Sequence, residues 1–195
     1  MKKIIFIFSL LIAFAACESK SKDGQREITV DSLKASIQEM DDSLNMMMEE
    51  AIKSPNYTMN KVAYHEAINR NKDFYARFPE NDFAEIAIGK VAGLYLQLNV
   101  EQEAVKWRDT LLNKYPNTQD KVGLLELQMN YYDLNEYDPE KIRHYANRLL
   151  AIENLPAERR EQYKYRLKHI DKTFDELIEL RMSESEEMVK TEKPM

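Results

Sequence analysis

The sequence predicts an all-α fold, a solenoid of helical hairpins with about seven helices and a C-terminal capping helix. Apolar residues recur at spacings of three and four, and no segment shows sustained strand alternation. The stretch from Ala67 to Pro79 is repeated 37 residues later from Ala104 to Pro116, and the proline follows the alanine at position +12 in both copies. Repeats of this length indicate stacked hairpins, because a single hairpin cannot bury its apolar face alone.

Apolar spacing and stop signals define the helices in order. The first carries three heptads of apolar residues, with Asp31-Ser32 as its cap and Ser54-Pro55-Asn56 as its end. Asp138 followed by Pro139 starts the sixth. The seventh opens at Ala157 and holds its apolar residues on one continuous stripe. The expected ranges are 30–51, 60–77, 82–98, 101–114, 118–132, 139–152 and one last helix from 157.

The N-terminus has the order of a secretory signal. Lys2 and Lys3 precede an apolar run from Ile4 to Phe14, then Ala15-Ala16, and Cys17 is the only cysteine. The run is too short to predict a membrane span. The expected organisation is a signal peptide at 1–16, a flexible polar tether at 17–28, the helical domain at 29–182 and a disordered tail at 183–195.

Phe14-Ala15-Ala16-Cys17 resembles the lipobox of bacterial lipoproteins, and this resemblance implies cleavage before Cys17 and lipidation of its thiol. The alternative is an ordinary buried or disulfide-forming cysteine, but the chain offers no second cysteine for a disulfide. Each buried methylene of an acyl chain contributes about 0.8 kcal/mol, so two or three chains form a lasting anchor. The expected protein is tethered to the membrane without spanning it.

The repeat itself resembles the tetratricopeptide repeat. Ala92, Tyr95, Ala104 and Pro116 stand at that family's spacing, whereas Glu126 occupies a position where a small residue is usual. The chain looks like the tetratricopeptide lipoproteins of Gram-negative envelopes. That resemblance implies an inner binding groove lined by the first helix of each hairpin. The residues placed there are Ile86, Gly89, Gly93, Leu96, Gly123, Leu127 and Asn130.

The groove contains three of the four glycines of the chain. A glycine within a helix costs about 0.5–1 kcal/mol relative to alanine. Two interpretations stay open: close packing of neighbouring helices, or a floor on which a partner segment lies near the backbone. A second candidate surface consists of Arg160, Lys164 and Lys168, which share one helix face and would attract an acidic partner. The alternative is that neighbouring side chains neutralise these charges.

No residue pattern indicates catalysis, a metal or a cofactor. His65, His144 and His169 lie on separate predicted helices, and no phosphate loop or nucleophile motif is present. The full chain has 28 basic and 34 acidic side chains, and removal of the signal takes away Lys2 and Lys3 only. This acidic balance argues against nucleic acid as a partner.

We therefore expect a non-enzymatic, lipid-anchored interaction module of the bacterial envelope, at the periplasmic face of the outer membrane. Its partner would be another envelope protein or a peptide segment. An alternative is an accessory protein associated with peptidoglycan, which assists a synthase or a hydrolase. The heptads of residues 30–51 also permit a homo-oligomer, although the same stripe could simply pack on the next helix.

Overall fold

The structure, a computed structural model, describes residues 28–56 and 58–191. In these residues it is built from helices without strands, which confirms the all-α prediction. Cys17, the predicted signal and the tether up to residue 27 lie outside the described residues. The helices are α1 (Val30–Lys53), α2 (Lys61–Arg77), α3 (Asp82–Gln97), α4 (Glu101–Lys114), α5 (Lys121–Leu134), α6 (Pro139–Leu150), α7 (Ala157–Lys168) and α8 (Phe174–Thr191).

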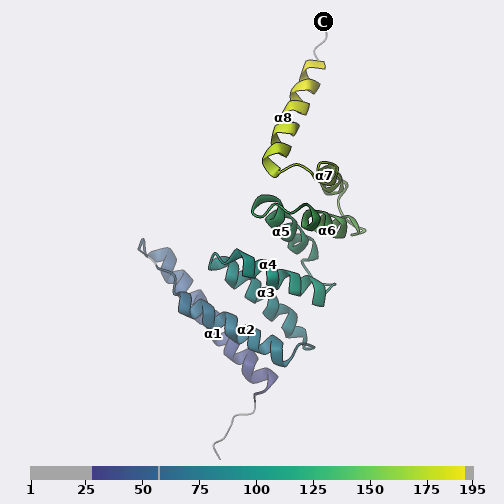
Figure 1. The fold of residues 1–195 in the computed structure, drawn as a ribbon. Helices are drawn as coiled ribbons and strands as arrows, with labels where there is room; N and C mark the ends of the chain where they lie inside the picture. The colour runs from purple at the N-terminus through teal and green to yellow at the C-terminus, as the bar shows by residue number, and fades with distance from the viewer. Residues whose placement is uncertain (1–27, 57, 192–195) are drawn as a thin grey trace, which may run out of the picture.

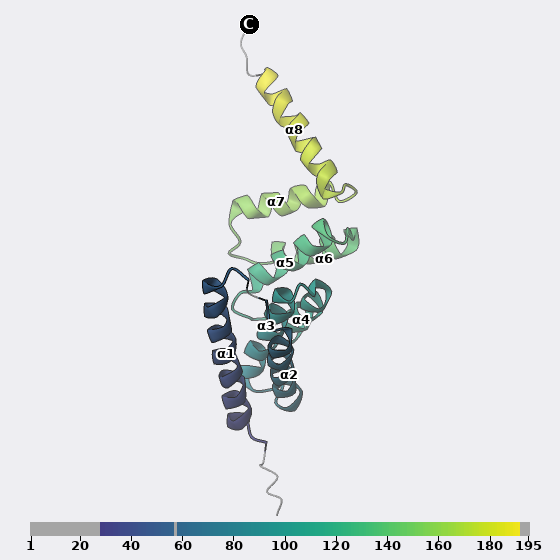
Figure 2. The same cartoon turned by 90° about the vertical axis from the view of Figure 1, so that its left-hand side faces the viewer.

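Each helix from α1 to α6 packs on the next one along the chain. The result is an elongated stack with α1 and α2 at one end, while α8 projects from the other end (Figures 1 and 2). Local contacts of this kind suit a solenoid, in which each unit touches only its neighbours.

The repeat period predicted from the sequence is visible in the hydrogen bonds between units. Tyr115 donates to the carbonyl of Pro79, 36 residues earlier, over 2.8 Å. Arg148 donates to the carbonyl of Leu112 at the same separation, over 3.1 Å. Bonds at separations of 33 to 37 residues continue to α7. Successive hairpins are therefore joined at equivalent positions.

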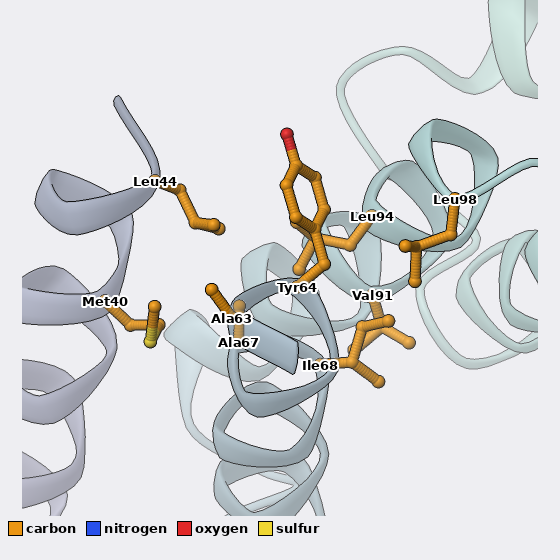
Figure 3. Packing of buried hydrophobic residues seen from close by; sticks show 9 residues of the cluster. All are labelled: Met40, Leu44, Ala63, Tyr64, Ala67, Ile68, Val91, Leu94 and Leu98. Carbon is orange, nitrogen blue, oxygen red and sulfur yellow. The ribbon is translucent and has the colours of Figure 1, made fainter. Parts of the chain in front are cut away.

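The first core cluster lies between α1, α2 and α3 (Figure 3). Met40 and Leu44 of α1 point toward Ala63 and Ala67 of α2, whose small side chains let the helices approach. Ile37 belongs to an adjoining cluster around Phe74. The heptad stripe of α1 is thus covered within the chain by α2 and α3.

Two details of the helix ends differ from the prediction. The first helix is capped by Thr29, whose hydroxyl accepts from the backbone N–H of Ser32 while the Ser32 side chain accepts from that of Thr29. Asp31-Ser32 therefore does not form the N-cap itself. Helix α8 continues to Thr191, beyond Ser183, where a disordered tail was expected.

The largest difference is that the predicted seventh helix is two helices. The backbone turns between Lys168 and Phe174, and a capping box starts α8 there. The backbone N–H of Thr173 donates to the carboxylate of Glu176 over 2.7 Å, and the N–H of Glu176 donates to the Thr173 hydroxyl over 3.4 Å. The Thr173 bonds lower the pKa of Glu176. Thr-x-x-Glu is the sequence signal that marks this break.

The break also accounts for the charges that lie beside it, although Arg159 and Arg160 stay in the first turn of α7. In one long helix, basic residues first and acidic residues second would oppose the helix dipole. In two helices, Arg166 and Lys168 lie in the last turn of α7, and Asp175 and Glu176 lie in the first turn of α8. Each of the charges beside the break then sits at the end of a helix that favours it.

Candidate binding surfaces

A hollow opens between α1 and α3 on the side of the predicted groove. Its two adjoining parts have volumes of about 350 and 180 Å³ and share Asp41, Leu94 and Gln97. Met48 and Gln38 of α1 line the larger part. Asp41 of α1 forms an ion pair with Lys90 of α3, and this pair joins the two helices beside the hollow.

Gly93 lies in the smaller part and is exposed. A Cβ added at Gly93 would meet nothing within 4 Å, and one at Gly89 would make only an ordinary contact of 3.9 Å with Leu111. Close helix packing therefore does not explain either glycine. Gly123 differs, because its Cβ would meet the carboxylate oxygens of Asp120 at 2.7 Å.

The structure does not gather the predicted groove residues into one site. Gly93 belongs to the hollow between α1 and α3, whereas Asn130 lines another of about 450 Å³ between α5, α7 and α8. The aliphatic side chains of Ile86, Leu96 and Leu127 are 52%, 43% and 47% exposed and lie outside both hollows. They form a scattered apolar surface on α3 and α5.

The predicted basic stripe is largely engaged within the chain. Arg160 donates to the carbonyl oxygens of Leu150 and Ile152 over 2.7 and 2.9 Å, which satisfies the C-terminal end of α6. Lys164 pairs with Glu161 over 2.8 Å, and Lys168 is exposed. Arg160 and Lys164 therefore both have partners within the chain, although the pair of Lys164 with Glu161 lies at the surface.

Buried polar groups in the C-terminal half were not anticipated from the sequence. Gln128 has no exposed surface; it accepts from Arg108 over 2.8 Å and donates to Asp109 over 2.8 Å. Tyr145 donates to the same Asp109. Burial, and then the bond to Asp109, raises the pKa of Tyr145. This network joins α4, α5 and α6.

A second polar connection joins α5 to α7. Arg166 donates two bonds of 2.8 Å to the Asp133 carboxylate, and both side chains are less than one-tenth exposed. Burial would lower the pKa of Arg166, but its bonds and charge attraction to Asp133 reverse that effect and raise it. Nearby, Glu126 accepts from Tyr163 and from Arg159. This accounts for a glutamate at a repeat position that usually holds a small residue.

The remaining polar chemistry is that of the histidines and the acidic residues that the structure describes. Among them no group of three or more His, Cys, Asp or Glu residues is arranged to hold a metal ion. Burial, followed by the charges of Arg148 and Lys141, lowers the pKa of His144, whose ring stands against Tyr145. In the described part of the chain, no helix combines the length and apolar character of a membrane span.

No protein-family model, curated protein or solved structure matches this chain. The functional argument therefore depends on the geometry above.

Proposed function

We propose that the chain is a lipid-anchored, non-enzymatic protein-interaction module of the bacterial envelope, facing the periplasm from the outer membrane. The signal-like N-terminus and Cys17 support the anchor. The solenoid of stacked helices supports the binding role, because such stacks present long continuous surfaces to their partners. The tetratricopeptide resemblance supports the same role.

The hollow between α1 and α3 is the observation that carries the binding proposal. Exposed Gly93 lowers helix stability, yet no side chain packs against it. A glycine at this position leaves the backbone of α3 open to an incoming segment. Asn45 and Gln97 around the hollow supply amides that can pair with the backbone of such a segment, and Gln38, whose amide nitrogen donates to Asp42 over 2.8 Å, adds its carbonyl oxygen.

The test compares two leucine substitutions of matched size. Gly93→Leu places a side chain in the hollow, and Ala76→Leu adds bulk at an exposed position of α2. After crosslinking of whole envelopes, proteins captured by the wild type and by Ala76→Leu should be lost with folded Gly93→Leu. Retention of the same proteins by Gly93→Leu contradicts the assignment of the hollow. If the protein sediments with purified sacculi, and Gly93→Leu does not change this, the result would instead favour an accessory protein associated with peptidoglycan.

The anchor has its own test. Cys17→Ser should abolish incorporation of labelled palmitate and release the protein from membranes, while the helical circular dichroism stays unchanged. A wild-type protein that fractionates as soluble, or that takes up no palmitate, contradicts the lipoprotein assignment without affecting the binding proposal.

A further inference from the structure

Helix α7 already closes the C-terminal end of the solenoid. Its buried side chains, Tyr163 and Arg166, face the preceding helices. None of its exposed side chains is a large apolar one. A terminal repeat with a polar outer face is what a solenoid needs at its end. Helix α8 is therefore not required to cover the core.

Helix α8 nevertheless carries apolar side chains that face solvent. Phe174, Ile178 and Met182 are 39%, 43% and 60% exposed, and their four-residue spacing places them on one side of the helix. We call these three residues the α8 stripe. Of the α8 side chains described, up to Ser185, only Leu177 is buried, and no other helix packs broadly on α8. Among the residues that the structure describes, no helix covers the α8 stripe.

The base of α8 is nevertheless held firmly. Arg166, fixed by Asp133, also donates to the carbonyl oxygens of His169 and Lys172 over 2.7 and 2.9 Å. Tyr137 donates to the carbonyl of Ile170 over 2.7 Å. These bonds fix the turn from which α8 projects (Figures 1 and 2). The stripe is therefore presented in a set direction.

The stripe leads into the hollow of about 450 Å³ between α5, α7 and α8. Phe174 and Ile178 line this hollow together with the buried side chains of Met129 and Leu177. The rest of the lining is polar and includes two ion pairs, Arg159 with Glu126 and Arg166 with Asp133. An apolar patch with a polar rim is typical of protein contacts, and the apolar part of this hollow is the surface formed by Met129, Phe174, Leu177 and Ile178. It provides a place for an apolar side chain of the occupant.

Charge identifies the occupant. Up to Ser185, α8 carries Asp175, Glu176, Glu179 and Glu184 against the single cation Arg181. Asp175 and Glu179 directly follow two residues of the α8 stripe and lie at one edge of it. Arg181 lies at the other edge, where its guanidinium stands over the ring of Tyr165 in α7. A second copy would bring these acids against identical acids, and anionic lipid would be repelled in the same way.

We propose that the α8 stripe and the apolar part of this hollow bind a cationic amphipathic helix of another protein, with apolar residues on the stripe and Lys or Arg beside Asp175 and Glu179. This inference deepens the proposed interaction function and uses a different surface from the hollow at Gly93. Apolar contact supplies the affinity, and the acidic edge selects the sign of the partner's charge.

The probe is a synthetic amphipathic helix of leucine and lysine, with the matching leucine and glutamate helix as reference. Binding to the full chain in nonionic detergent is followed by fluorescence anisotropy. The lysine peptide should bind and the glutamate peptide should not. Ile178→Ser should weaken binding about tenfold, since losing one apolar contact of about 1.4 kcal/mol has that effect. Glu179→Lys should weaken it at low salt, and this difference should vanish near 1 M salt.

Matched controls separate the α8 stripe from other surfaces. Leu96→Ser removes an aliphatic side chain with the same 43% exposure as Ile178, and Glu153→Lys reverses an exposed acid elsewhere. Both controls, and Gly93→Leu, should bind the lysine peptide like the wild type. Loss of crosslinked partners with Gly93→Leu concerns only the hollow, and loss of peptide binding with Ile178→Ser concerns only α8.

Three results overturn the proposal. Equal binding of the lysine and glutamate peptides would show that charge does not select the partner. Unchanged binding by Ile178→Ser would show that the α8 stripe is not the binding surface. Self-association, or binding to phosphatidylglycerol vesicles, that disappears in Ile178→Ser assigns the stripe to a second copy or to a membrane instead.

Discussion

The two ends of the solenoid are held together by different chemistry. Between α1, α2 and α3 the core consists almost entirely of apolar side chains, and the phenol of Tyr64 and the amide of Asn71 are the polar groups that lie buried among the residues described there. From α4 to α7 the buried set includes Arg108, Gln128, Asp133 and Arg166. The N-terminal end depends on apolar packing, whereas the C-terminal end also depends on paired charges and amides.

This difference determines how each end responds to change. Apolar packing is non-directional and tolerates swaps that conserve volume. A buried ion pair is directional, and removing one partner leaves a charge without compensation. Substitution of a single buried polar residue should therefore destabilise the C-terminal end most. A change of pH that alters the charge of side chains should leave the N-terminal end largely intact.

The largest effect is expected from Arg166→Leu. This change leaves the Asp133 carboxylate buried without its partner, and it also removes the donors that hold the α7–α8 turn. We expect a loss of about 3–5 kcal/mol in the free energy of unfolding, measured by urea denaturation. Arg77→Leu, which breaks the exposed pair with Asp73, should cost at most about 1 kcal/mol.

The double variant Asp133→Leu with Arg166→Leu sharpens the comparison. It removes both charges, so it should recover much of the stability lost in Arg166→Leu. If the double variant is less stable than Arg166→Leu, the ion pair does not account for the loss, and the C-terminal end resembles the N-terminal one.

A second prediction concerns alkaline pH. Burial, followed by the bond to Glu136, raises the pKa of Tyr131 from 10.0 to about 12, and burial beside Glu126 also raises that of Tyr163. A raised pKa favours the neutral phenol in the folded state. Its contribution to stability is complete below pH 10 and is lost as pH rises toward 12.

Tyrosinate absorbance and limited proteolysis together measure this effect. Cleavage should begin between α4 and α7 as the buried phenols ionise, and α1 to α3 should resist longer. Tyr163→Phe removes one of these ionisations and leaves Glu126 bonded to Arg159, so its alkaline transition should move to higher pH. An unmoved transition, or first cleavage in α1 to α3, contradicts the predicted contrast.

The same contrast explains what the sequence could reveal. Apolar periodicity located all the helices of the N-terminal end, because its core is made of the residues that define the pattern. Buried polar residues disturb that pattern. Glu126 looked like a departure from the repeat, and only its bonds with Tyr163 and Arg159 show why it is tolerated. Spatial pairing across 33 or 37 residues is invisible to local spacing.

The turn between α7 and α8 shows the same limit. Leu167, Ile170, Phe174 and Leu177 satisfy a helical stripe, so the apolar pattern passes through the break. The sequence signals of the break are the Thr-x-x-Glu spacing of Thr173 and Glu176 and the change from basic to acidic residues. For the candidate site, the place of Gly93 on its helix was enough to predict that it is exposed. That Gly93 and Asn130 line two different hollows could be seen only in the three-dimensional structure.

The smallest effect is expected at two glycines on equivalent helices, Gly93 in α3 of the N-terminal end and Gly123 in α5 of the C-terminal end. Gly93→Ala places a methyl group in open space and should raise the free energy of unfolding by about 0.5–1 kcal/mol, because alanine is the better helix former. Gly123→Ala brings its Cβ to 2.7 Å from the Asp120 carboxylate, which must move, so the gain should be smaller or absent. Urea denaturation of both variants measures the difference. An equal gain at both positions shows that Asp120 moves freely, whereas a loss at Gly93 shows that the hollow between α1 and α3 is closed in solution.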